Sequence, residues 1–321
     1  MFYPMSRRVM QVQPAQPPQQ PDGTSQNPFL IAQAADFVAI KNNLIGGNTL
    51  PYFYKVVNNI DFTDVAIPFS ASEAEFHGHI DGNFKKFSNI TMSGSSDLFG
   101  IFRNLGGSIK YLKFENINIQ NSGTGFCGIC GGVGNNTTIE RCWVTGIVKT
   151  TNRGGSAFVG AGNNTGSIIN CINEAIVQTN NYPTGGFVGQ NYSVNFIIQN
   201  CLSLGNISSG NGETSGYIGY TTAANTIRNC VAAMNTITTN NTNGGRIQGN
   251  ATSSLTNNYA LNTMTVKGAT VSGNANDKNG ANATIQQLKS RAFYENTLGW
   301  DFTNVWEIDE GNGFPTLKGF N

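Results

Sequence analysis

Histidine, cysteine and carboxylate side chains are the residues of this chain whose types could support chemistry. In the stretch FHGHID, His77, His79 and Asp81 are candidate metal ligands, because imidazole and carboxylate groups bind divalent metals. On a β-strand the two histidines share one face, opposite Phe76 and Ile80, so burial of the apolar pair would expose both histidines. Further ligands are not evident in the sequence. We therefore expect surface histidines, with no metal and no cofactor.

A second candidate is the C-x-x-C spacing of Cys127 and Cys130 in the stretch FCGIC. A zinc site of this kind needs a second pair of ligands, and a redox site needs a helix start in a thioredoxin-like unit. The sequence shows neither. Cys127 also occupies the position of Val159 and Val188 in a repeated motif described below, which favours packing in a core.

Carboxylates are sparse in the centre of the chain, although β-helical enzymes that act on polysaccharides gather two or three of them on one face. Between Asp97 and Asp277 the acids are Glu115, Glu140, Glu174 and Glu213. Glu115 and Glu174 share a repeat position two repeats apart, about 10 Å in a stacked solenoid, without basic or aromatic neighbours. Nucleophile, phosphate-binding and dinucleotide-binding motifs are also missing. The sequence predicts no catalytic residue and no enzyme.

Four tyrosines fall in turn regions, where their rings could stack on sugar rings. The alternative is that they are ordinary exposed or lining side chains. The candidate glycan-contacting residues are Tyr182, Tyr192, Tyr217 and Tyr220.

A repeated element must position these side chains. The cysteines of IERCWV, IINCIN, IQNCLS and IRNCVA are separated by 29, 30 and 29 residues. An FVG-like motif recurs in phase with them and decays to RIQG at 246 to 249. Two landmarks with one period indicate a solenoid or blade architecture. The cysteines of the first landmark are Cys142, Cys171, Cys201 and Cys230.

The repeat length selects the fold. Short β-branched segments alternate with turns rich in Gly, Asn and Ser, and no repeat shows a helical period. About 30 residues with two or three strands fit one coil of a β-helix, whereas a propeller blade usually needs about 40 to 50. The sequence therefore predicts an all-β, single-stranded, right-handed parallel β-helix. Its equivalent residues would stack about 4.8 Å apart, and the four cysteines would form a structural core ladder of free thiols.

Composition agrees with a folded, nearly neutral protein. The chain has 321 residues, 39% hydrophobic and 12% charged, with 19 Lys and Arg against 18 Asp and Glu. Such a balance disfavours nucleic acid and anionic membranes as partners. There is no apolar run of the roughly 18 to 20 residues that a membrane span needs, and we identify no signal peptide. We expect cytoplasmic folding and reduced cysteines.

The iterated combination of GGFVGQN with IIQNCLSLGNI resembles the GLUG-type repeats of bacterial surface proteins and phage-encoded proteins. NPFLIAQAADFVAIKNNL looks like their entry module, and WDFTNVWEIDEGNGFPTL looks like their closing element. The resemblance covers about residues 27 to 321 and implies the solenoid fold. It does not select a function, because such repeats occur in adhesins, in stalks beside catalytic domains and in virion parts.

The chain divides into four segments. Residues 1–26 are rich in Pro and Gln and form an extended partner-binding arm. Residues 27–97 form an N-terminal cap and entry coils, with a helix at about 32 to 44. Residues 98–283 form the repeat β-solenoid, and residues 284–321 form a C-terminal cap whose helix Thr284 can N-cap. In the arm, the expected anchors on a partner protein are Phe2, Tyr3, Arg7 and Arg8.

We identify no secretion signal before the arm and no catalytic residue in the solenoid. This combination predicts a structural component of a bacteriophage virion: a fibre, appendage or capsid decoration. Its arm would bind other virion proteins, and its solenoid would contribute to attachment to the host surface or to a glycan. A homo-trimer is expected by analogy with viral fibres. One alternative is a glycan-binding adhesin at the bacterial cell surface, and another is a polysaccharide-degrading enzyme.

Overall fold

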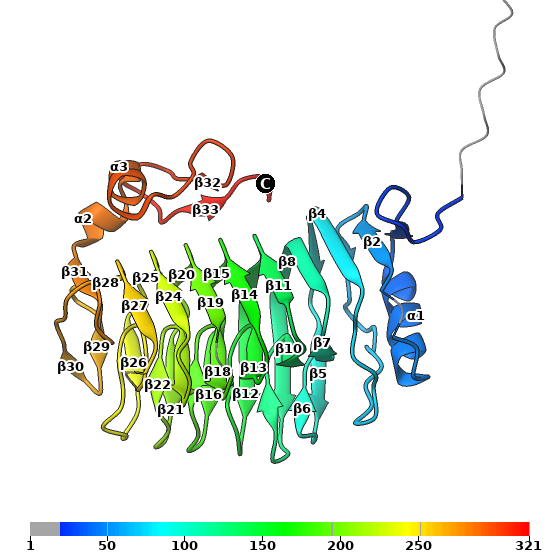
Figure 1. Ribbon diagram of the computed structural model, residues 1–321, viewed down its shortest axis with the longest axis horizontal. Helices are drawn as coiled ribbons and strands as arrows, with labels where there is room; N and C mark the ends of the chain where they lie inside the picture. Colours follow the sequence, from blue (N-terminus) through cyan, green and yellow to red (C-terminus); the bar gives the residue numbers. More distant parts are fainter. Residues whose placement is uncertain (1–19, 50, 194, 251, 321) are drawn as a thin grey trace, which may run out of the picture.

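The computed structural model describes residues 20–49, 51–193, 195–250 and 252–320 and forms a parallel β-solenoid of about eight turns (Figure 1). This confirms the predicted fold class. The expected anchors Phe2, Tyr3, Arg7 and Arg8 lie outside the described residues. Within the described ranges, no helix has the length and apolar character required to cross a membrane.

The first coils carry an N-terminal helix. Helix α1 (Ala34–Ile45) buries Phe37 against the rings of Phe62, Phe87 and Phe102, at centroid distances of 5.2 to 5.9 Å. The predicted helix is therefore present. The strands of this region are β1 (Phe29–Ile31), β2 (Phe53–Val56), β3 (Ile60–Asp61), β4 (His79–Ser88), β5 (Thr91–Gly94), β6 (Leu98–Phe99) and β7 (Phe102–Leu105).

The central coils repeat one strand pattern in parallel register. Their strands are β8 (Ser108–Asn121), β9 (Phe126–Cys127), β10 (Cys130–Val133), β11 (Thr137–Glu140), β12 (Trp143–Thr150), β13 (Val159–Gly162), β14 (Gly166–Ile169), β15 (Ile172–Asn173), β16 (Ile176–Thr179), β17 (Thr184–Gly185), β18 (Val188–Asn191), β19 (Phe196–Gln199), β20 (Leu202–Ser203), β21 (Ile207–Ser209), β22 (Thr214–Ser215), β23 (Ile218–Thr221), β24 (Thr226–Arg228), β25 (Val231–Ala232) and β26 (Thr236–Thr238). The last turn contains β27 (Ser254–Thr256), β28 (Tyr259–Leu261), β29 (Thr265–Val266), β30 (Ala269–Thr270) and β31 (Ala281–Ala283).

Columns of equivalent residues form the core. One apolar column follows the strand register from Ile80 to Leu255, and all of its members are buried. Its members between these ends are Ile109, Ile139, Ile168, Ile198 and Ile227. A second column stacks Phe158, Phe187 and Tyr217 nearly parallel, at centroid distances of 4.9 and 5.0 Å.

The four repeat cysteines occupy one buried column, and all six cysteines of the chain are free and buried. Each thiol also satisfies backbone groups at a bend of its coil. The Cys171 Sγ accepts from the Cys142 amide at 3.3 Å, and the Cys201 Sγ accepts from the Cys171 amide at 3.4 Å. Asn258 takes the cysteine position in the last coil, where its Oδ1 accepts from the Cys230 amide at 3.1 Å. The column therefore needs a small side chain that accepts a hydrogen bond.

The residue before each of these positions adopts the left-handed conformation. Asn170, Asn200, Asn229 and Asn257 have φ between 53° and 56°. Asparagine tolerates this region better than other non-glycine residues, whereas a β-branched side chain is strongly disfavoured there. The Asn-Cys pairs of the sequence thus mark a bend between two strands of each coil.

Replacing Asn200 by valine should lower the free energy of unfolding by about 2 kcal/mol, because a β-branched residue is strained at a φ of 53°. Asn200→Gly is the matched control, since glycine adopts this φ without a steric penalty. Urea titration followed by circular dichroism measures both. Equal stability of the valine and glycine variants would contradict the conformational role of Asn200.

The C-terminal segment differs from the predicted end cap. It contains α2 (Ile285–Leu288), α3 (Arg291–Phe293), the π-helical turn η1 (Tyr294–Leu298), β32 (Trp306–Glu307) and β33 (Thr316–Leu317), and Thr284 does N-cap α2. It folds back along the side of the solenoid, so that Phe320 contacts Phe84 of an early coil (Figure 1). Hydrogen bonds to the bends hold it there: Trp300 Nε1 donates to the Asn229 carbonyl at 2.9 Å, and Asn257 Nδ2 donates to the Thr297 carbonyl at 2.8 Å.

Candidate functional site

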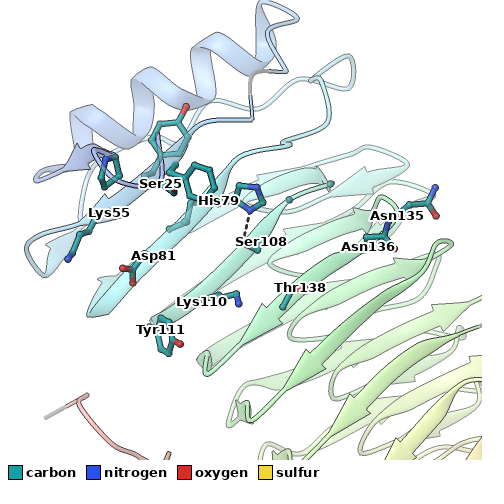
Figure 2. Close-up of a pocket in the computed structure, with 16 residues that line it drawn as sticks. Ser25, Lys55, His79, Asp81, Ser108, Lys110, Tyr111, Asn135, Asn136 and Thr138 are labelled. Atoms are coloured by element: carbon teal, nitrogen blue, oxygen red, sulfur yellow. Dashed lines mark hydrogen bonds between the residues drawn. The ribbon is translucent and has the colours of Figure 1, made fainter. Parts of the chain in front are cut away.

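An open groove of about 830 Å³ lies on the outward face of the first coils (Figure 2). It crosses β2, β4, β8 and β11, and loop residues close its two ends. Ser25 and Pro28 line it at the N-terminal end, and Asn135 and Asn136 line it at the other. Because the strands run in parallel register, the groove presents columns of side chains from successive coils.

Strand alternation positions the first of these columns. Ile80 and Ile109 point into the core, so the residues on either side of each point outward. The column before them consists of Phe53, His79, Ser108 and Thr138, one from each strand, in direct register.

Within this column a histidine and a serine are hydrogen bonded. The His79 Nδ1 lies 2.9 Å from the Ser108 Oγ (Figure 2). The imidazole also stacks on the Phe53 ring, with centroids 4.6 Å apart and planes at 28°. Burial, and then the nearby Lys110 ammonium, lower the pKa of His79 below its ordinary value of 6.5. Near neutral pH the imidazole is therefore uncharged and able to accept a proton.

The second outward column alternates in charge. Lys55, Asp81, Lys110 and Glu140 follow one another in register, and the first three line the groove. The Lys110 Nζ lies 2.9 Å from a Glu140 carboxylate oxygen. Opposite charges on neighbouring strands stabilise the pairing of those strands, and they also offer a ligand both signs of charge.

The histidine motif does not form a metal site in the described ranges, where no cluster of three or more His, Cys, Asp and Glu residues could hold an ion. His77 is exposed, and its Nε2 lies 3.7 Å from a Glu75 carboxylate oxygen. His79 and Asp81 belong to different columns of the groove instead. Cys127 and Cys130 are buried, and burial raises the pKa of both thiols.

The candidate carboxylates Glu115 and Glu174 have basic and aromatic neighbours, contrary to the expectation from the sequence. Glu115 lies 2.6 Å from the Lys86 Nζ and 3.0 Å from the Lys113 Nζ. Glu174 accepts from Trp143 Nε1 at 3.0 Å. The Lys113 Nζ also lies 4.2 Å from the Trp143 ring centroid, so both carboxylates belong to one network of basic and aromatic side chains from neighbouring coils.

The prediction that Tyr217 could contact a glycan is wrong. Tyr217 is fully buried, and its hydroxyl donates toward the Cys201 and Val231 carbonyls at 2.8 and 2.6 Å. It continues the aromatic column of the core and cannot contact a glycan. Tyr182 and Tyr192 are 41% and 49% exposed, and the Tyr192 and Tyr220 rings lie 6.2 Å apart. Glycan contact by these three stays a prediction.

The pairing of His79 with Ser108 was not predicted from the sequence. A signal was available, because the two residues are 29 residues apart, which is one coil of the repeat. Extending the period backward into the entry module would have placed them side by side. Their outward column contains no cysteine or aromatic-glycine landmark, so the repeat is not visible there.

Comparison with known proteins identifies only structural neighbours. No family model matches the chain, and no curated protein matches it. The GLUG-type resemblance therefore stays a prediction. A crystal structure of a Bacteroides ovatus protein, named as a candidate immunoglobulin A1 protease, is similar at a TM-score of 0.76 and 20% identity. That similarity covers 93% of this chain and 94% of the other.

A second solved structure, named IgA1 protease, is similar at a TM-score of 0.51 and 16% identity. It covers 80% of this chain but 21% of the other, so the solenoid corresponds to one part of a longer protein. Identities this low establish a shared fold alone.

The names of these neighbours overturn two expectations from the sequence. The assignment to a non-enzymatic bacteriophage virion component is wrong, and so is the prediction that the chain is no enzyme. These expectations relied on the repeat of inward apolar residues. That repeat does not indicate which side chains lie next to each other on the outward face of a solenoid. A scarcity of acidic residues excluded only carboxylate chemistry, and it said nothing about a serine next to a histidine.

Proposed function

We propose that this chain binds an extended segment of a secreted polypeptide in its outward groove and serves the cleavage of that polypeptide. The observation that carries the proposal is the pair of outward columns, one neutral and hydrogen-bonding, the other alternating in charge. The protease names of the two structural neighbours support it at the level of fold. A location at the cell surface or outside the cell follows from such a substrate.

The dimensions of the groove suit a short stretch of extended chain. Four strands about 4.8 Å apart span roughly 14 Å, which accommodates about four extended residues at about 3.3 Å each. Phe53, which is 36% exposed, offers an apolar surface at one end. Ser108 and Thr138 can hydrogen bond to backbone amides, and Lys55 and Asp81 can pair with charged side chains.

The test is binding of the full chain to immobilised immunoglobulin A1 and to an unfolded casein, measured by biolayer interferometry. The double variant Phe53→Ala/Lys110→Ala should bind at least about ten-fold more weakly, because it loses an aromatic contact and a charge in the groove. Lys149→Ala is the matched control, since this exposed lysine of β12 lies outside the groove. Equal affinities of the double variant and the unmodified protein, or binding to neither probe, would overturn the proposal.

A further inference from the structure

The hydrogen bond between His79 and Ser108 has the geometry of an activated nucleophile. A serine hydroxyl reacts when a neutral base lies within about 2.6 to 3.2 Å of its oxygen, and the Oγ–Nδ1 distance is 2.9 Å. Both side chains line the groove, and Ser108 is 8% exposed, so a bound chain must pack closely against β4 and β8 to reach the hydroxyl (Figure 2).

The same outward column contains a serine without this partner. Ser167 lies two strands further along, in register with Thr138 on one side and Ile197 on the other. Serine is therefore not confined to the groove, but its contact with a histidine is a property of Ser108. Ser167 therefore serves as a comparison for Ser108: it has the same position in the column but lacks the histidine partner.

We propose that Ser108 is the nucleophile and His79 its general base in the cleavage of an acyl bond of the bound polypeptide. This inference rests on the proposed function, because the groove must first hold the chain. Phe53 is a positioning residue, since its ring stacks on the imidazole and fixes the plane in which the Nδ1 faces the serine.

The reaction balances without an external oxidant or reductant. The Ser108 Oγ forms a bond to the substrate carbonyl carbon while its proton passes to the His79 Nδ1. The C–N bond of the substrate then breaks, and the protonated imidazole gives its proton to the leaving amine. Water attacks the resulting ester while His79 takes a proton from that water. The ester C–O bond then breaks, the imidazolium returns its proton to the Ser108 Oγ, and the products are a carboxylic acid and the free serine.

The groups around the pair complete the site. Thr138 follows Ser108 in the column and Asn136 lines the same groove, so a hydroxyl and an amide are available to donate to the developing oxyanion. Lys110 of β8 is the charged group that acts on the imidazole, and Glu140 of β11 is bound to Lys110. Asp81 of β4 and Lys55 of β2 line the same groove in the neighbouring column.

The pH dependence follows from the protonation of His79. A lowered pKa means that the imidazole stays neutral down to a lower pH than a free histidine does, so the base remains available at neutral pH. Reaction at Ser108 should therefore be constant above pH 6.5 and fall as the pH drops through the folded pKa, which lies below that value. Phe53→Leu should shift this profile toward higher pH, because it uncovers the imidazole.

The experiment is labelling of the full chain with a fluorophosphonate probe, read by peptide mass spectrometry. The Oγ attacks phosphorus, the P–F bond breaks, and fluoride leaves. We expect the phosphonyl group on Ser108, its loss in Ser108→Ala, and a decrease of about 100-fold in rate in His79→Asn. Ser167→Ala should label like the unmodified chain. Thermal unfolding followed by circular dichroism verifies that each variant folds.

The outcomes separate this inference from the proposed function. Labelling of Ser108 that depends on His79 supports the nucleophile, even if no polypeptide binds to the groove. Absence of label on Ser108 while immunoglobulin A1 or casein still binds would overturn the nucleophile and leave the binding proposal intact. Labelling at the same rate in His79→Asn would remove the histidine from the mechanism.

Discussion

Replacing Glu73 by glutamine is expected to lower the free energy of unfolding by about 3 to 5 kcal/mol, because it leaves a buried ammonium group without its counterion. Lys41 of α1 and Glu73 are fully buried, with the Lys41 Nζ 2.6 Å from both carboxylate oxygens. The same Nζ donates to the Ile101 carbonyl at 2.5 Å. The pair therefore ties the N-terminal helix to the first coils.

Urea titration of Glu73→Gln measures this loss of stability. Two further variants test whether the loss comes from the buried, unpaired charge. Lys41→Met/Glu73→Met should recover most of the stability, since it removes both charges and retains volume. Glu115→Gln breaks a partly exposed pair with Lys86 at the same 2.6 Å and should cost less than about 1 kcal/mol. Similar losses for Glu73→Gln and Glu115→Gln would contradict the role of burial.

Replacing Arg246 by methionine is expected to cost at least about 3 kcal/mol, because each hydrogen bond from a charged donor contributes about 1.5 to 3 kcal/mol. Arg246 is fully buried and donates to the carbonyls of Asn279 at 2.8 Å, Leu261 at 3.3 Å and Gly280 at 2.8 Å. Burial lowers the pKa of its guanidinium to about 10, so the group stays charged at neutral pH. Methionine would leave the buried carbonyls of Leu261 and Gly280 and the partly buried carbonyl of Asn279 without this donor.

The loss should appear first at the C-terminal end of the solenoid, where these carbonyls belong to the loop that closes the last coil. Limited proteolysis should cut the chain between residues 261 and 280 faster in Arg246→Met. Arg228→Ala is the matched control, since this exposed arginine contacts Gln199 and its removal should change stability by about 0.5 kcal/mol or less. An unchanged cleavage pattern in Arg246→Met would show that the loop does not depend on the guanidinium.

The role of Arg246 was not predictable from the sequence. In the sequence it is an aromatic position lost in a decayed last repeat. In the structure, the bridges between Ser215 and Gly245 and between Ile218 and Gln248 place Ile247 opposite Tyr217. Arg246 instead satisfies carbonyls of the closing loop. Asn258 replaces cysteine for a related reason, because its amide both accepts from the Cys230 amide and donates to the Ile227 carbonyl. Both residues hydrogen bond to backbone groups near the C-terminal end of the solenoid.

The candidate site was less predictable than the core. Inward columns must be apolar in every coil, so their period is visible in the sequence. Outward columns are not part of the apolar core, and their residues differ from coil to coil, as Phe53, His79, Ser108 and Thr138 do. The sequence analysis considered His79 with its near neighbour His77, whereas the structure pairs it with a residue one coil away.

By itself, the sequence determined the repeat length, the parallel β-solenoid, the N-terminal helix and the buried cysteine column, because local propensity and apolar periodicity are written in consecutive residues. Only the tertiary structure decided that Tyr217 is buried, that the C-terminal segment folds back along the side, and that His79 meets Ser108. Each of these depends on contacts between residues far apart in the chain. Such contacts are set by the register between neighbouring coils, and the sequence of a single coil does not specify that register.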